Sequence, residues 1–464
     1  MKKPLIQRRW NRRDRTGERG VTLALVAASI VAMLAMAALS IDVGSLYLAK
    51  AEMQRAADTG ALAGARSLSL SGMTGDPTNA AGQWAAACLQ AEQVARATAA
   101  QNSVAGANLP LGDVVSAAQD TTGNFCNAAS GPVAFGVNPQ VTVTISGVNL
   151  PLYFAPAMRA FFSPGASRSV TMGATAAAEV YNPSAAVNFS ASGLQLPVAP
   201  RCVKPWIVAN ADPVPHNGNP AGGKFVNLAD GSIVNPGFAA PLGTGVIGEQ
   251  IILRADCFNG AGTCNPPRDA QVGIRNGALE FVPGQTVGPF VAVPSGATGS
   301  SFQEASGGCD TRVVYACGTA NGALGDLTIN PGGSGGDTAV AVESLINYAG
   351  GGNDDIDTGV YPFQIQAGSG NPLVTNGVPG VADGTIISAS NSIVTVPIFD
   401  STNPLPGGSS PALTIVGFLQ LFITDVQTSN NGHLVAKVLN VSGCGTATGT
   451  AVGGTSPVPV RLLQ

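Results

Sequence analysis

The side chains that usually carry enzyme chemistry are scarce in this chain. Of its 464 residues only two are histidines, His216 and His433, and both lie beside turn-forming residues. Most acid–base, triad and zinc sites use histidine, so this shortage argues against a typical hydrolase or metalloenzyme. We expect both imidazoles to be solvated, and we expect a protein that is not an enzyme and carries no cofactor.

Two glycine-rich stretches match catalytic or cofactor motifs in letters only. Residues 243–248 read G-x-G-x-x-G, but a dinucleotide site needs a helix after this motif, and here a β-like segment follows. Residues 332–336 read G-x-S-x-G without the strand–turn–helix setting of a nucleophile elbow. A secreted hydrolase that pairs Ser334 with His433 is therefore disfavoured; it would lose activity on Ser334→Ala.

The best sequence candidate for a metal site is the acidic stretch of residues 353–357. Its carboxylates belong to Asp354, Asp355 and Asp357. Hard oxygen ligands in a glycine-flanked loop suit Ca²⁺. The EF-hand pattern fails, because Thr358 stands where glycine is required and Gln364 where the bidentate glutamate should be. We interpret the stretch as a solvated acidic loop and its three carboxylates as weak metal candidates.

Cysteine is the other residue type with a clear chemical meaning. The eight cysteines are Cys88, Cys126, Cys202, Cys257, Cys264, Cys309, Cys317 and Cys444. An even number outside the N-terminal segment favours disulfides, whereas zinc is disfavoured because no C-x-x-C occurs. Many pairings are possible. We expect two local clips, Cys257–Cys264 and Cys309–Cys317, one bond from helix to sheet, Cys88–Cys126, and one that closes the C-terminal part, Cys202–Cys444.

All of these groups belong to a chain that has a candidate membrane segment near its N-terminus. Residues 21–41 carry no charged side chain, and a helix of that length spans about 31 Å, close to the hydrocarbon thickness of a bilayer. Residues 1–20 hold eight basic and two acidic side chains, and such a flank stays cytoplasmic. We predict a basic cytoplasmic segment (1–20), a transmembrane helix (21–41) and an extracytoplasmic body. The body has no basic patch, so we expect no nucleic-acid partner.

A cleaved signal peptide is the alternative to a retained anchor. Ala35-Met36-Ala37 fits the small-x-small cleavage pattern. The apolar run continues past this site to Ile41, and helix-forming residues follow, so we favour a retained anchor that extends into a rod of about 45 residues. Gly60 and Gly64 form a G-x-x-x-G, which we expect to pack closely on the rod's own domain rather than to drive dimerisation.

The stretch of residues 18–65 resembles the N-terminal region of TadG-like proteins of the Flp/Tad pilus-assembly system. The similarity lies in the Arg-Gly that ends the basic segment, the apolar span, the Asp-Val-Gly at its outer end and an alanine-rich block. The matching positions include Gly20, Asp42, Gly44, Tyr47, Asp58 and Gly64. The resemblance implies a single-pass inner-membrane protein whose large periplasmic or surface body builds or anchors a thin adhesive pilus.

Two features found in such systems are missing. Their pilin-like members carry a glutamate five residues after the processing glycine, whereas Leu25 stands there after Gly20 and residues 21–41 contain no acid. We therefore expect an uncleaved anchor. Some TadG-like proteins carry a von Willebrand A-type domain with an Asp-x-Ser-x-Ser metal motif, which this sequence lacks.

Asp42 stands at the outer end of the apolar span. It either pairs with a partner helix or marks where the helix leaves the lipid for water.

The predicted fold class is α+β, in two parts. Residues 42–183 should form a loosely pilin-like stalk with a helix over 80–100, strands at 140–146 and 167–180, and a buried aromatic stretch at 151–165. Residues 186–445 should form a β-rich domain, either a sandwich or an irregular β fold, whose clearest hairpin joins 419–427 to 433–441. Residues 446–464 should be a flexible tail.

These features favour a membrane-anchored, non-enzymatic structural or assembly protein of a Flp-type pilus. Its partners would be the lipid bilayer and pilus-assembly or cell-envelope proteins. The alternative is a surface-exposed binding module or adhesin, anchored to or secreted across the membrane. If that module were calcium-dependent, Asp355→Ala should abolish a Ca²⁺-induced rise in melting temperature.

Overall fold

The computed structural model describes most of the chain, with gaps. The described residues are 16–71, 81–119, 139–154, 169–180, 198–216, 222–239, 245–255, 273–317, 335–348, 353–359, 363–378, 380–387, 389–402, 413–427, 432–444, 452–454 and 456–463. Within them the protein has a long N-terminal helix, further helices and many strands, which confirms the predicted α+β class.

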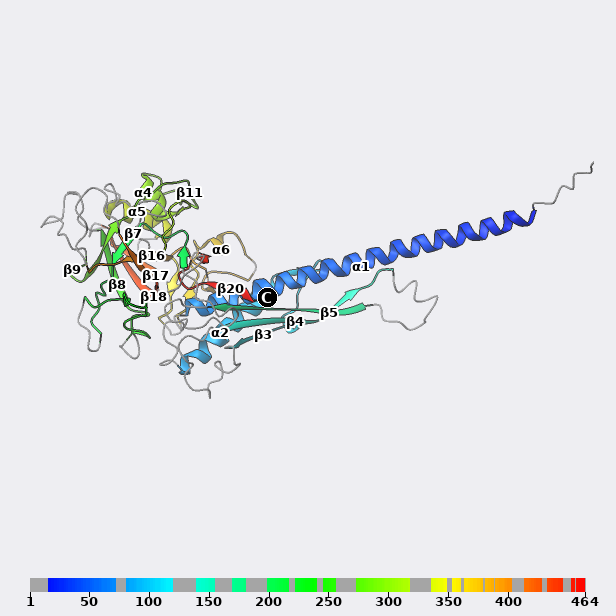
Figure 1. Ribbon diagram of the computed structural model, residues 1–464, viewed down its shortest axis with the longest axis horizontal. Coiled ribbons are helices and arrows are strands. Elements are labelled where there is room, and N and C mark those ends of the chain that lie inside the picture. The colour runs from blue at the N-terminus through cyan, green and yellow to red at the C-terminus, as the bar shows by residue number, and fades with distance from the viewer. Residues whose placement is uncertain are drawn as a thin grey trace, which may run out of the picture.

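The first helix, α1 (Thr16–Leu70), is a single element with two different surroundings. Alanine, leucine and methionine dominate it, and these residues favour helix. Figure 1 shows its N-terminal half projecting far beyond the body while its C-terminal half lies within it. In the C-terminal half one stripe is buried at helical spacing: Ala49, Met53, Ala56, Ala57, Ala61, Ala65 and Leu68. One helix therefore forms both the projecting rod and part of the core.

The second helix, α2 (Ala81–Ala100), and a sheet complete the N-terminal part. The sheet has the strand order β20-β5-β4-β3 and is antiparallel throughout. Its strands are β3 (Val114–Gln119), β4 (Gln140–Pro151), β5 (Ser169–Val180) and β20 (Val460–Leu463). Helix α1 lies across β4 and β5, and α2 packs on α1 and β3 (Figure 1). The helix predicted over 80–100 and both predicted strands are confirmed.

The two glycines of the G-x-x-x-G motif lie where α1 meets α2. A Cβ atom at Gly60 would stand 2.8 Å from the Ala95 carbonyl oxygen and 2.9 Å from the Ala99 Cβ atom. A Cβ atom at Gly64 would stand 2.9 Å from the Ala91 carbonyl oxygen. These distances are too short for a real Cβ atom beside a backbone carbonyl, so only glycine lets α1 and α2 approach this closely. The expected close packing on the rod's own domain is confirmed.

The C-terminal part closes into a barrel, where we had expected a sandwich or an irregular fold. The strands β7 (Trp206–Ala209), β16 (Ile393–Phe399), β17 (Ile415–Gln427), β18 (His433–Gly443), β8 (Gln250–Ala255) and β10 (Ala278–Pro283) are neighbours in that order. Because β10 also pairs with β7, the described sheet has no free edge there. The predicted hairpin is β17–β18, with Gln427 opposite His433. Closure explains why β10 is buried along its whole length.

Short elements decorate these two parts. They are β1 (Ser103–Val104), β2 (Ala107–Asn108), η2 (Leu111–Asp113), β6 (Val198–Pro200), β9 (Ile274–Arg275), β11 (Phe290–Val291), α4 (Ser301–Gly307), β12 (Cys309–Asp310), α5 (Gly335–Leu345), β13 (Ile356–Asp357), β14 (Ile365–Gln366), α6 (Pro372–Thr375), β15 (Ile386–Ile387) and β19 (Val452–Gly454). Strand β9 pairs with β10, and β13, β14 and β15 form a small sheet.

The last residues are not the flexible tail that we predicted. Strand β20 pairs with β5, and Arg461 forms an ion pair of 2.5 Å with the fully buried Glu179. Strand β19 pairs with β6. A flexible segment would have left the carboxylate of Glu179 buried without this cation, which is costly. The C-terminus therefore returns to the sheet of the N-terminal part (Figure 1).

The end of α1 also reaches the C-terminal part. Leu70 packs in a cluster with Phe363, Phe422 and Leu439. The side-chain amide of Asn440 on β18 donates to the Ser69 carbonyl oxygen at 2.7 Å. The rod is thus held by both parts of the body.

Candidate functional site

The apolar half of α1 has the properties of a membrane segment. Within the described residues this is the one helix that is long and apolar enough to cross a bilayer, with a mean hydropathy of 2.4 over its best window. None of that window is buried in the protein. Its large apolar side chains are in the open: Leu23, Val31 and Leu34 are each more than half exposed. A soluble protein rarely leaves so long an apolar surface uncovered, so this half of α1 is a candidate single-pass membrane anchor.

Asp42 lies directly after this segment, and it neither faces water nor is left for a partner helix, the two alternatives that the sequence suggested. Its side chain is buried, with only 2% of the residue exposed. One carboxylate oxygen accepts from the backbone N–H of Tyr153 at 2.9 Å, and the other accepts from the N–H of Phe154 at 3.0 Å. Asp42 therefore ties the end of β4 to α1 where the helix leaves the candidate membrane segment.

The aromatic residues held by Asp42 point outward. Tyr153 is 64% exposed and Phe154 is 43% exposed, so the described start of the 151–165 stretch is not buried as we predicted. The family-motif residue Tyr47 is also exposed. Tyrosine and tryptophan rings favour the interface between lipid and water, which suits aromatic side chains at this level of the helix.

Removing the carboxylate of Asp42 should loosen this junction. In Asp42→Ala the N–H groups of Tyr153 and Phe154 lose a charged acceptor, which should lower the free energy of unfolding by about 2–3 kcal/mol. Thermal unfolding of the detergent-solubilised chain measures the loss. Asp58→Ala is the control, because Asp58 accepts only a bond from Gln54 on the surface of the same helix, and it should change stability by less than about 0.5 kcal/mol. Equal melting temperatures for the two variants would contradict this role of Asp42.

The acidic stretch 353–357 does not gather its carboxylates at one point. Asp354 accepts from the Gly370 N–H at 2.6 Å. Asp355 is buried and accepts from the side-chain amide of Asn371 at 2.8 Å, and Asp357 forms an ion pair with Lys437. Each carboxylate thus stabilises a different part of the surrounding loops. The stretch is neither a solvated loop nor a ready Ca²⁺ site, and the calcium-dependent alternative loses its sequence support.

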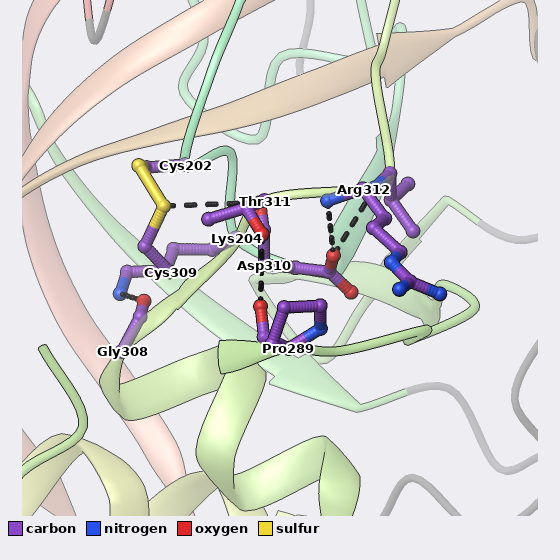
Figure 2. The surroundings of a disulfide bond; sticks show 9 residues. Cys202, Lys204, Pro289, Gly308, Cys309, Asp310, Thr311 and Arg312 are labelled. Carbon is purple, nitrogen blue, oxygen red and sulfur yellow. Dashed lines mark hydrogen bonds between the residues drawn. A yellow bond between two sulfur atoms is a disulfide. The ribbon is translucent and has the colours of Figure 1, made fainter. Parts of the chain in front are cut away.

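Two disulfides join distant parts of the chain and correct the pairings that we expected. They are Cys202–Cys309 and Cys317–Cys444, with Cα–Cα distances of 4.5 and 5.0 Å. Cys309 pairs with Cys202 (Figure 2) rather than with its sequence neighbour Cys317, because β12 carries it beside the segment that follows β6. Cys88 is also disulfide-bonded. The expected pairs Cys88–Cys126 and Cys257–Cys264 involve residues outside the described ones.

A buried lysine lies next to the first disulfide. Lys204 is buried, and its ammonium donates to the Gly308 carbonyl oxygen at 2.7 Å (Figure 2). Burial disfavours the charged form and lowers the pKa of Lys204 to about 7. In the unfolded chain this lysine keeps a proton up to about pH 10. Between these two values the unfolded state binds more protons, so stability from this group increases with pH and is lowest below pH 7.

Replacing this lysine should therefore stabilise the protein in acid more than in base. Lys204→Met loses the bond to Gly308 but removes the cost of a buried charge, and we expect a net gain of about 2 kcal/mol at pH 6 that shrinks towards zero by pH 9.5. Urea unfolding at the two pH values measures the difference. The exposed Lys224→Met is the control and should show no such dependence. A gain that is the same at both pH values would contradict the assignment.

The residues of the rejected motifs are only partly described. Ser334 and the first glycine of each motif, Gly243 and Gly332, lie outside the described residues, whereas α5 begins at Gly335, so a helix does follow the G-x-S-x-G. Strand β8 follows the G-x-G-x-x-G, as expected. His433 opens β18 and is partly exposed. Its pKa is lowered by partial burial and by the nearby Arg254 guanidinium.

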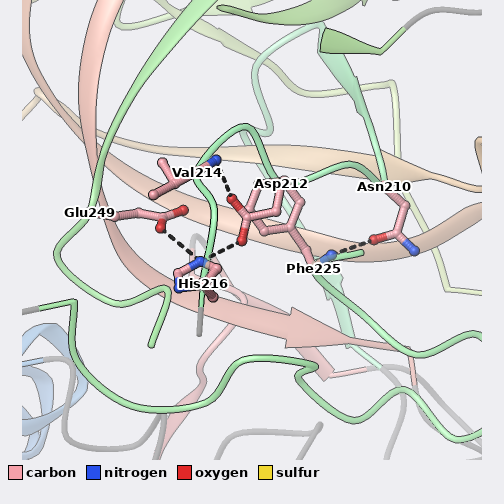
Figure 3. A network of polar contacts seen from close by, with 6 residues as sticks. All are labelled: Asn210, Asp212, Val214, His216, Phe225 and Glu249. Carbon is pink, nitrogen blue, oxygen red and sulfur yellow. Dashed lines mark hydrogen bonds and ion pairs between the residues drawn. The ribbon is translucent and has the colours of Figure 1, made fainter. Parts of the chain in front are cut away.

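His216 is the clearest site residue that the sequence interpretation missed. We expected it to be solvated, yet it is 8% exposed and lies between two buried acids, Asp212 and Glu249 (Figure 3). Its Nε2 atom stands 2.8 Å from Asp212 Oδ2 and 3.2 Å from Glu249 Oε2. Burial, reinforced by the Asp212 carboxylate, raises the pKa of Glu249 to about 9. The i, i+4 spacing of Asp212 and His216 was the available signal, but nothing in the sequence connected Glu249 to them.

Backbone hydrogen bonds next to the barrel strands hold the two acids of this cluster. Asp212 follows β7, and its Oδ1 atom accepts from the Val214 N–H at 2.9 Å, which fixes the carboxylate. Glu249 directly precedes β8, and its carbonyl oxygen accepts from the Val438 N–H at 2.9 Å. Both acids are thus anchored by strands of the barrel.

The fold and the exposed apolar helix define a protein with a candidate single-pass anchor and an α+β body. Residues 20–67 match the family described as "Putative Flp pilus-assembly TadE/G-like". The match runs from Gly20 to near the end of α1, and it confirms the resemblance seen in the sequence. Neither the curated proteins nor the solved structures gave a match to this chain.

Proposed function

We propose that this chain is a non-enzymatic tether of the Flp pilus machinery. It anchors in the inner membrane by residues 21–41, keeps its basic N-terminus in the cytoplasm and holds its body outside, where the body docks pilus or envelope components. The observation that carries this proposal is the division of α1 into an exposed apolar half and a half buried in the body. A helix built in this way transmits the position of the membrane to the body without a flexible linker.

Three further observations support this arrangement. The basic side chains of residues 1–20 favour a cytoplasmic N-terminus. The exposed aromatic rings of Tyr47, Tyr153 and Phe154 lie where the outer surface of the bilayer would fall. Disulfides of the kind found in the body persist in oxidising compartments such as the periplasm. The matched family is generally structural, which fits a role in tethering rather than catalysis.

The test is genetic complementation in the host bacterium. Deletion of the gene should abolish surface Flp pili, and the wild-type chain should restore them. Val31→Arg combined with Leu34→Arg should fail, because each arginine at mid-membrane costs about 3 kcal/mol and the anchor would not hold. Ala32→Leu is the matched control on the same exposed segment and should restore pili fully.

Two results would overturn the proposal. One is a deletion strain that assembles normal pili. The other is full restoration of pili by the doubly charged variant, since a tether released from the membrane could not act as one.

Ser334→Ala should restore pili as the wild type does, because no bond chemistry is assigned to this chain.

A further inference from the structure

Among the residues that the structure describes, the cluster of Asp212, His216 and Glu249 contains a carboxylate that accepts no hydrogen bond. The three residues are 1%, 8% and 4% exposed, so water does not compensate their charges. Nε2 of His216 can carry one proton at most, and it lies closer to Asp212 than to Glu249. Neither carboxylate oxygen of Glu249 receives a hydrogen bond within the described structure. A buried carboxylate in this state is costly unless a proton or a cation accompanies it.

The spacing of the candidate ligand atoms fits a metal ion. One ligand atom from each side chain lies within 4.8 Å of the other two. Zinc bonds of about 2.0–2.1 Å at tetrahedral angles place neighbouring ligand atoms about 3.3 Å apart. The observed separations from Nε2 are 2.8 and 3.2 Å, so small movements would suffice to admit an ion. Among the described residues no other group of histidine, cysteine and acidic side chains meets this spacing.

The charge and the supporting contacts fit the same ion. Once Glu249 has released its proton on metal binding, the two carboxylates and a neutral imidazole carry two negative charges, which a divalent cation neutralises inside the buried site. One nitrogen and two oxygen ligands suit Zn²⁺ better than Ca²⁺, which prefers oxygen ligands only. The Val214 N–H donates to Asp212 Oδ1, and this contact fixes the carboxylate with Oδ2 turned towards His216.

We propose that Asp212, His216 and Glu249 form a zinc site in the barrel, in which they supply three of the four tetrahedral ligands and a water molecule supplies the fourth. The ion would join the segment that follows β7 to the residue that precedes β8, two positions far apart in the sequence. It would thus cross-link the barrel in addition to the disulfides. The site is independent of the proposed tethering function, which the zinc measurements do not test.

Metal binding to the full-length protein in mild detergent tests the site. After treatment with a chelator and dialysis against Zn²⁺, we expect one bound zinc per chain by elemental mass spectrometry. Saturating Zn²⁺ should raise the melting temperature by about 5 °C or more. X-ray absorption at the zinc edge should show nitrogen and oxygen neighbours and no sulfur.

His216→Gln and Glu249→Gln should each lose the bound zinc, whereas His433→Gln, which changes the other histidine, should keep it. If a site variant fails to fold, the wild-type stoichiometry and absorption spectrum still decide. Less than 0.2 zinc per chain in the wild type, a sulfur neighbour in the spectrum, or full zinc retention in folded His216→Gln would overturn the proposal. In the first case the cluster holds a shared proton instead of a metal.

Discussion

Replacing Gly60 and Gly64 together by alanine is expected to destabilise the body by about 3 kcal/mol. Each new Cβ atom would meet a carbonyl oxygen of α2 within 3 Å, and backbone atoms in the middle of a helix cannot move aside. The two helices must separate, and the alanines of α2 at 91, 95 and 99 lose their contacts with α1. Because alanine favours helix over glycine by about 1 kcal/mol per site, the measured loss understates the steric cost.

The matched control for this double variant is on the same helix. Gly44 is exposed and has no atom within 4 Å of the place where a Cβ would stand, so Gly44→Ala should raise stability slightly. Urea unfolding of the detergent-solubilised chain should therefore give changes of opposite sign. A double variant as stable as the parent protein would show that α1 and α2 do not pack as described.

Loss of the Cys317–Cys444 disulfide is expected to have the largest effect on stability. The bond closes a loop with a sequence separation of 127 residues. In the chain-entropy account, such a cross-link stabilises the folded state by about 5 kcal/mol, because it restricts the unfolded chain. Cys317→Ser with Cys444→Ser should therefore lower the melting temperature by about 10 °C or more.

The single variant Cys444→Ser provides the control for this effect, since it removes the same bond and should be destabilised nearly as much. A mass shift of two hydrogens per bond on reduction of the parent protein verifies that the bond is present. A double variant that melts within about 2 °C of the parent would contradict the pairing.

Local patterns predicted the elements of the fold well. Three local patterns predicted the type and the approximate position of an element. They are the charge-free stretch 21–41, the alanine-rich segment 80–100 and the alternation at 140–146. The β17–β18 hairpin was visible because its strands adjoin. Barrel closure was not, because β7 and β10 are separated by more than 70 residues and their pairing leaves no local signal. The strand β20 escaped prediction for the same reason.

The sites were harder to predict because they depend on contacts between distant segments. The sequence marked Asp42 as a position of interest, but only the fold brings Tyr153 and Phe154 to its carboxylate. His216 appeared solvated because its neighbours favour turns, whereas the barrel places Glu249 against it. Proximity misled the disulfide assignment, since Cys309 and Cys317 belong to segments that diverge after β12.

The most direct test of the membrane arrangement is cysteine accessibility in spheroplasts. None of the cysteines that the structure describes is free, so a single introduced cysteine can be labelled selectively, with the unmodified chain as background. Leu34→Cys and Leu89→Cys are a matched pair, because the two leucines are 65% and 60% exposed in the protein. Gln7→Cys reports on the basic N-terminal segment.

A membrane-impermeant maleimide should label Leu89→Cys rapidly, Gln7→Cys only after lysis, and Leu34→Cys only after the bilayer is dissolved by detergent. Equal labelling of Leu34→Cys and Leu89→Cys in spheroplasts would contradict the account, because the apolar half of α1 would then lie in water.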